Sequence, residues 1–192
     1  MKVRVLGAHN QEAQHTKHTC FLLDGVIAID AGSLMTGLSL EERESIQAIL
    51  LTHRHFDHTR DIWPLGMSMK KVGNTIDVFG IEDTINMVAS TLLGPEFTKT
   101  DFTRVPSPEK PTYRYHVVEF YKEFQVLDYT VVAVPVPHAV PAAGYQISSD
   151  DVKLFYTGDT GRGVMEAWKH VAPRVLLTEV TFGNENEAGA DE

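Results

Sequence analysis

The chain has 192 residues, of which 43% are hydrophobic and 22% charged, a composition that excludes collagen-like, mucin-like and wholly disordered proteins. Seventeen Lys and Arg residues against 26 Asp and Glu residues give a formal charge of -9, which disfavours binding to nucleic acid mainly through phosphate neutralisation. No apolar run approaches the roughly 18 residues that span a bilayer, and the first residues do not resemble a signal peptide. We therefore expect a cytoplasmic protein with no membrane partner.

The first segments of the chain predict the antiparallel edge of a sheet. Strands are expected at 2–6, 19–23 and 26–30, and the Asp24-Gly25 turn joins the last two. The single cysteine, Cys20, lies in the second of these strands and is expected to be a small buried residue.

The next stretch predicts a buried strand that leads into a group of histidines. After a helical turn at 41–45, residues 46–52 form a nearly continuous apolar run, which is typical of a strand buried on both faces. A strand at 75–80 and a helix at 81–93 follow, and Gly94-Pro95 ends that helix. Residues 94–111 contain four prolines and are expected to form an irregular connection.

The second half of the sequence is rich in strands. They are expected at 117–120, 124–136, 143–148, 153–157 and 175–180, with a helix at 164–170. Two strand-rich halves that each end in helical material indicate a layered α/β sandwich rather than a doubly wound sheet. We expect one domain over 1–182 and a polar tail over 183–192.

Three imidazoles and a carboxylate follow the buried strand within six residues: His53, His55, Asp57 and His58. Neutral imidazole nitrogen and carboxylate oxygen are ligands for zinc, iron and manganese. A loop leaving a strand can direct His53 and His55 to one point, and Asp57 and His58 to another. Because the set lacks cysteine, a catalytic metal is favoured over a structural one. Chance assembly of this string is on the order of one in a million per site.

Two later segments place a candidate ligand just after an apolar strand. His138 follows Val134-Pro135-Val136-Pro137, and Asp159 follows Phe155-Tyr156-Thr157-Gly158. Each of these features alone is more often an ordinary edge residue or a plain turn. Together with the first cluster they become candidates: His138 would complete the first metal site, and Asp159 could bridge two ions about 3.5–4 Å apart.

The string His53-x-His55-x-Asp57-His58, followed by His138 and Asp159, resembles the metallo-β-lactamase superfamily over nearly the whole chain. Residues 7–10, 29–32 and 177–182 resemble its branch of ribonuclease Z and class II cyclic nucleotide phosphodiesterases. The resemblance implies a four-layer αββα sandwich with two divalent metal ions at one edge of the sheets. Zinc is the first choice, with manganese or iron as alternatives.

The resemblance also implies roles for single residues. Asp30 would support the histidine loop, although an Asp-Ala-Gly turn explains it equally well. Asp57 would ligate, orient the reacting water or accept its proton, and Glu179 would orient a histidine that protonates the leaving oxygen. That histidine is absent, because only His170 follows Asp159, and His170 is expected at a helix end. We therefore expect a shortened version of a longer protein with an incomplete C-terminal part of the fold.

The expected function is metal-dependent hydrolysis of a small phosphodiester, such as a cyclic nucleotide, by a metal-bound hydroxide. The net charge and the single basic doublet, Lys70-Lys71, argue against a large RNA. Residues such as Phe102, Arg104, Tyr113 and Tyr115 could contact the ligand, although an ordinary structural role is favoured for most of them. Two other readings stay open: a di-iron oxygen-binding or redox protein, and a non-catalytic metal-binding module. Lactone or thioester hydrolysis also stays open, and the branch implies a homodimer as one assembly.

Overall fold

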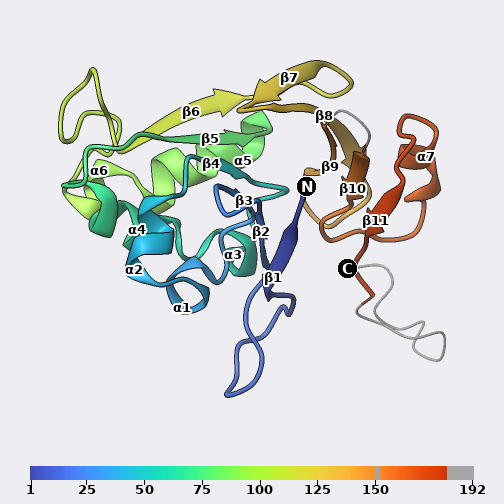
Figure 1. The fold of residues 1–192 in the computed structure, drawn as a ribbon, viewed down its shortest axis with the longest axis horizontal. Helices are drawn as coiled ribbons and strands as arrows, with labels where there is room; N and C mark the ends of the chain where they lie inside the picture. Colours follow the sequence, from blue (N-terminus) through green and yellow to red (C-terminus); the bar gives the residue numbers. More distant parts are fainter. Residues whose placement is uncertain (150–151, 181–192) are drawn as a thin grey trace. The chain divides into compact units, whose positions relative to one another are not determined.

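The computed structural model describes residues 1–149 and 152–180, and Figure 1 shows its elements in sequence colours. The chain divides into two compact units, Met1–Val117 and Val118–Glu192. Across the described residues, no helix combines the length and apolar character that a membrane crossing requires. The expectation of one domain over 1–182 stays a prediction, and the expected tail at 183–192 lies outside the described residues.

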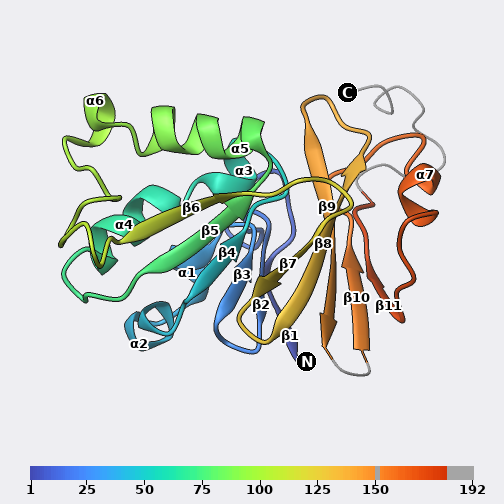
Figure 2. The ribbon, with the colours of Figure 1, turned by 90° about the horizontal axis from the view of Figure 1, so that it is seen from above.

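The first unit is built on a six-stranded sheet in the order β1-β2-β3-β4-β5-β6. Strands β1, β2 and β3 pair antiparallel, which confirms the expected opening of the chain. Strands β3 to β6 run parallel, so their carboxyl ends meet at one edge of the sheet (Figure 2). The bounds are β1 Val3–Gly7, β2 Cys20–Leu23, β3 Ile27–Ile29, β4 Ala48–Leu50, β5 Ile76–Gly80 and β6 Tyr113–Val117.

Apolar residues of helices and strands form one core in this unit. Leu34, Leu65 and Ile85 of three helices belong to the same buried cluster as Ile49 and Val78 of the sheet. All three residues of β4 are buried, as expected for a central parallel strand. The helices are α1 Leu34–Gly37, α2 Leu40–Glu44, α3 Phe56–Thr59, α4 Ile62–Met69, α5 Glu82–Met87 and α6 Pro95–Thr98, and a π turn, η1 Val88–Leu92, extends α5.

The second unit contains a five-stranded sheet in the order β11-β10-β9-β8-β7. Strands β7 to β10 pair antiparallel, and β10 pairs parallel with β11, so β8, β10 and β11 all run in one direction. Helix α7 (Met165–Trp168) packs through Ala167 in a cluster with Val134 and Phe155. The strands are β7 Glu123–Val126, β8 Tyr129–Val136, β9 Ala142–Ser149, β10 Val152–Tyr156 and β11 Val175–Leu177.

Several expected elements are placed differently. The strand expected at 117–120 lies instead at Tyr113–Val117, where it pairs with β5. The single strand expected at 124–136 is a hairpin, because Leu127 adopts a positive φ of 52° and turns the chain. Helix α4 follows the histidine loop in a stretch for which no element was expected, and α6 lies in the expected irregular connection.

Candidate metal centre

A buried aspartate links the ends of β3 and β4 in the first unit. Asp30 follows β3, and its Oδ1 accepts hydrogen bonds from the backbone N–H of Thr52 at 2.8 Å and from the Thr52 hydroxyl at 3.0 Å. Both residues are fully buried, and Asp30 has a positive φ of 57°. A short polar residue tolerates this left-handed conformation. The carboxylate therefore fixes the point at which the histidine loop leaves the sheet.

The same carboxylate holds the last histidine of the string. Nδ1 of His58, which is fully buried in α3, lies 2.8 Å from Oδ2 of Asp30. An imidazole that donates its Nδ1–H to a carboxylate has its lone pair on Nε2, the atom that can then bind a metal. Asp30 thus has the supporting role that the resemblance implies for it.

The first two histidines of the string lie close together. Nε2 of His53 is 3.1 Å from Nδ1 of His55, and the two rings meet edge to face. Nδ1 of His53 lies 3.0 Å from the Thr52 hydroxyl, which can accept an N–H while its own proton goes to Asp30. That arrangement leaves the Nε2 lone pair of His53 on the side of His55.

Asp57 lies in the first turn of α3, next to His58. Its Oδ2 is 3.5 Å from Nε2 of His58, and its side chain is 16% exposed, whereas that of His58 is fully buried. Gly32 makes the close approach of this loop to β3 feasible, because a Cβ at Gly32 would lie 1.9 Å from the backbone oxygen of Asp57. The structure therefore brings all four predicted residues of the first string to one edge of this unit's sheet.

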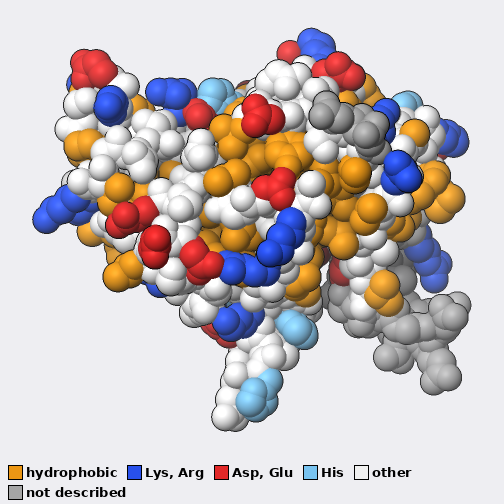
Figure 3. All heavy atoms as spheres, viewed as in Figure 1, with side chains coloured by type: hydrophobic (Ala, Val, Ile, Leu, Met, Phe, Trp, Pro, Cys, Tyr) orange, Lys and Arg blue, Asp and Glu red, His pale blue; other side chains and the backbone are white. Residues whose placement is uncertain are grey.

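Sequence reasoning did not single out Thr52 or His18. Thr52 orders both Asp30 and His53, and the only signal for it was its place directly before the string. The ring of His18 lies 6.4 Å from that of Phe56 and borders the same loop. Earlier in the β1–β2 connection, exposed histidine side chains lie on the surface, as Figure 3 shows in pale blue.

In the second unit, the three other predicted residues follow the three strands that run in one direction. His138 comes after β8, Asp159 after β10 and Glu179 after β11. The backbone N–H of Gly161 donates to the carbonyl oxygen of Pro137 at 2.7 Å, which joins the Asp159 turn to the residue before His138. All three predicted side chains are partly buried. This unit therefore gathers its predicted residues at one edge of its own sheet.

Phe102 and Tyr113 are buried core residues, which agrees with the structural role favoured for them, and the Tyr113 hydroxyl donates to the carbonyl oxygen of Ile62. His170 follows α7 as expected, and its ring lies 4.6 Å from that of Tyr121. Cys20 is buried as expected and donates its Sγ–H to the carbonyl oxygen of Asp30; burial raises the pKa of its thiol.

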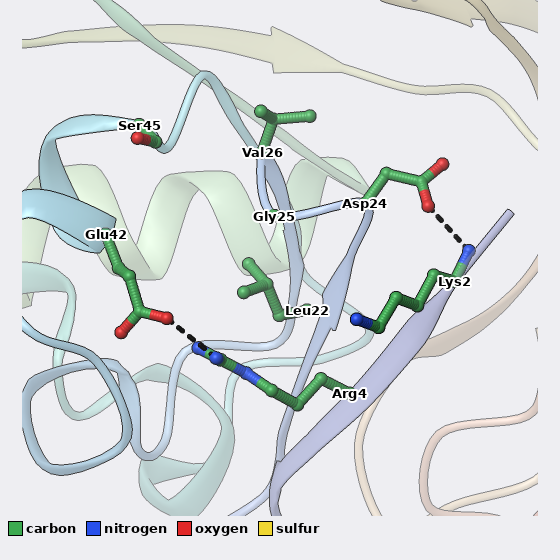
Figure 4. A pocket seen from close by; sticks show the side chains of 8 residues that line it. All are labelled: Lys2, Arg4, Leu22, Asp24, Gly25, Val26, Glu42 and Ser45. Atoms are coloured by element: carbon green, nitrogen blue, oxygen red, sulfur yellow. Dashed lines mark hydrogen bonds and ion pairs between the residues drawn. The ribbon is translucent and has the colours of Figure 1, made fainter.

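A pocket of about 470 Å³ lies at the start of β3, the end opposite to Asp30 (Figure 4). Three of its four charged side chains pair with one another or with the backbone. Arg4 contacts Glu42 at 2.7 Å, and Asp24 accepts a hydrogen bond from the backbone N–H of Lys2 at 2.6 Å. This pocket therefore balances its own charges and contains none of the predicted metal ligands.

A family model described as a beta-lactamase superfamily domain matches residues 19–190. Ribonuclease Z from Acaryochloris marina (strain MBIC 11017) is 30% identical over 111 residues, which are 55% of this chain and 31% of that protein. The aligned part therefore spans about a third of that relative's length.

Three solved structures share the fold of this chain. YhfI from Bacillus subtilis, a metallo-beta-lactamase fold protein, has a TM-score of 0.73 at 19% identity over 96% of this chain and 73% of its own. Unliganded yeast PDE1 has a TM-score of 0.70 at 14% identity, over 86% and 69% of the two chains. The short form of human tRNase Z has a TM-score of 0.63 at 18% identity, over 85% and 71%. The α/β class and the fold expected from the sequence are confirmed.

Proposed function

This chain belongs to the beta-lactamase superfamily, and on that premise we propose that it is a metal-dependent phosphodiesterase of the ribonuclease Z and phosphodiesterase branch. Two divalent ions would be held by six side chains, with Asp159 shared between them. The first ion would take His53, His55 and His138, and the second Asp57, His58 and Asp159.

The observation that carries this proposal is the arrangement of the imidazole rings in the first unit. Two nitrogens bound to one tetrahedral zinc ion at 2.0–2.1 Å lie about 3.3 Å apart. In this structure, Nε2 of His53 and Nδ1 of His55 are 3.1 Å apart, close to that distance. In addition, Thr52 and Asp30 contact the Nδ1 atoms of His53 and His58, so Nε2 is the nitrogen of each ring that would bind an ion. These donors fit zinc best, and manganese or iron can use the same set.

The second unit supports the proposal in a simpler way. His138 and Asp159 follow strands of the same direction, and the Gly161–Pro137 hydrogen bond holds their two loops together. That the two sets of donors act on the same ions is part of the proposal.

Ions bound by these residues would supply Lewis acidity toward a phosphoryl oxygen and lower the pKa of water. Among the carboxylates of the histidine loop, Asp30 is fully buried and occupied by Thr52 and His58. Asp57, by contrast, is partly exposed to solvent, with Oδ2 directed to His58. Asp57 is therefore the carboxylate of this loop that would ligate the second ion, orient the attacking water or accept its proton.

The substrate we propose is a small phosphodiester, such as a cyclic nucleotide. A net charge of -9 gives no general attraction for a polyanion, whereas a small diester is held by contacts within the site. A second candidate is RNA, because two of the relatives are named ribonuclease Z and tRNase Z. Those names count against the expectation that the chain does not act on a large RNA.

The first experiment measures metal content and activity on one sample of the protein. The substrates are bis(4-nitrophenyl) phosphate, cyclic AMP and a tRNA precursor. We expect about two zinc ions per chain and metal-dependent hydrolysis of the small diesters. Cleavage of the RNA alone would favour the second candidate, and a visible absorption band from bound iron would favour a di-iron centre. Tight binding of metal without hydrolysis of any of the three would favour a binding module.

The second experiment tests the ligands with His55→Ala and, as its control, His15→Ala on the exposed part of the β1–β2 connection. Loss of a direct ligand is expected to remove the first ion and to lower kcat/KM by about 100-fold or more. The control should keep its metal and activity. Equal metal content in His55→Ala and the parent protein would refute the ligand assignment.

A further inference from the structure

Glu179 contacts the turn that carries Asp159. Strands β10 and β11 pair parallel, with Tyr156 opposite Leu177, and the backbone N–H of Thr157 continues the pairing by donating to the Leu177 carbonyl at 3.1 Å. The two chains therefore leave the sheet side by side. Two residues beyond Leu177, Glu179 accepts a hydrogen bond at Oε2 from the backbone N–H of Thr160 at 3.1 Å.

The turn that follows β10 and carries Asp159 is constrained both before and after that residue. Gly158 precedes Asp159 and has a φ of 65°, a conformation in which side-chain-bearing residues are strained. After Asp159, the N–H of Thr160 donates to Glu179, and the N–H of Gly161 donates to the carbonyl of Pro137. Consecutive backbone amides thus join the Asp159 turn to the ends of β11 and β8.

A carboxylate is a strong acceptor for a backbone amide, and a partly buried one is only partly screened by water. Glu179 is partly buried, so its hydrogen bond to Thr160 restricts the backbone directly after Asp159. A side chain that ligates a metal binds more tightly when its backbone is already in the bound conformation.

We propose that Glu179 is a positioning residue, which fixes the Asp159 turn through the Thr160 amide and thereby raises the affinity of Asp159 for its ion. The inference rests on the proposed function for the metal, whereas the hydrogen bond itself joins two groups of the chain. It differs from the role that the resemblance implies for Glu179, the orientation of a histidine. The partner here is a main-chain N–H of the same sheet edge.

The test compares Glu179→Ala with Glu179→Gln, because a glutamine carbonyl oxygen can accept the same N–H without a charge. Glu119→Ala, which removes an exposed carboxylate paired with Lys122, is the matched control. The first measurement is amide hydrogen exchange at Thr160 in the metal-free protein. We expect exchange about tenfold faster in Glu179→Ala than in the parent, with Glu179→Gln and the control within about threefold of the parent.

The second measurement is the affinity for the second zinc ion, determined by competition with a chelator. We expect a loss of about tenfold in Glu179→Ala and near-parental affinity in Glu179→Gln. Unchanged Thr160 exchange in Glu179→Ala, or equal losses of affinity in the two variants, would overturn the inference. A parent protein that binds no second ion would instead refute the proposed function, while the exchange measurement still decides whether Glu179 fixes the turn.

Discussion

The two sheet edges that bear the predicted ligands are ordered in different ways. In the first unit, side chains order other side chains: Asp30 holds His58, and Thr52 contacts both Asp30 and His53, all in fully buried positions. In the second unit, two main-chain N–H groups join the loops, that of Gly161 to the Pro137 carbonyl and that of Thr160 to the Glu179 carboxylate. The first arrangement sets ring orientation and tautomer, whereas the second sets the course of a loop. We therefore expect substitutions in the first arrangement to lower stability and metal affinity more than substitutions in the second.

The largest effect is expected for Asp30→Asn. The amide nitrogen would face buried donors on Thr52 and His58, so we expect a loss of about 3 kcal/mol in the free energy of unfolding. Asp24→Asn is the matched control, because Asp24 also has a positive φ but lies in a turn at the exposed end of β2. It should lose less than about 1 kcal/mol. Urea unfolding of both variants measures the difference, and equal losses would show that the buried network adds nothing.

An intermediate effect is expected for Thr52→Val. This change keeps the side-chain volume but removes the hydroxyl between Asp30 and His53, so we expect a loss of about 1–2 kcal/mol in stability and about tenfold in zinc affinity. Thr52→Ser should retain most of both, because its hydroxyl can make the same contacts. Calorimetric zinc titration provides the measurement. Full zinc affinity in the valine variant would show that Thr52 does not orient His53.

The smallest effect is expected at the other end of β3, where Glu42 and Arg4 form an exposed pair. The hydrogen bond from Arg4 lowers the pKa of Glu42 from 4.5 to about 2. Because the folded-state pKa is depressed, the contribution is fully present above pH 4.5 and is lost as the pH falls toward 2. Glu42→Gln should therefore flatten the pH dependence of stability only within that window. Chemical unfolding at pH 6, 4 and 2.5 checks this, and a difference from the parent that grows above pH 5 would contradict it.

The sequence predicted the parts of the site that local patterns carry. The apolar run before His53 indicated a central buried strand, and β4 is such a strand. The ligand string followed at once, so its place at a strand end could be predicted. Thr52 could not be singled out in the same way, because its importance arises from a hydrogen bond to Asp30, 22 positions earlier in the chain.

The β7–β8 hairpin and β6 were predicted at other positions because no local sequence signal marks their bounds. Leu127 has no residue-type signal for a positive φ, so the β7–β8 hairpin could not be recognised within an apolar stretch. For β6, the apolar residues after position 116 favoured a later strand, but pairing with β5 selects Tyr113–Val117 and leaves Val117 exposed. Tertiary pairing decides such cases over local propensity.

The contact between Cys20 and Asp30 has a practical consequence. Its sulfur is buried in the first unit and contacts the backbone carbonyl of Asp30, the residue that orders the histidine loop, and its raised pKa disfavours the nucleophilic thiolate. Alkylating agents can therefore reach it only when this part of the molecule opens. Cys20 is therefore an intrinsic chemical probe. The rate at which iodoacetamide modifies it measures how often the structure around Asp30, which supports the histidine loop, opens locally.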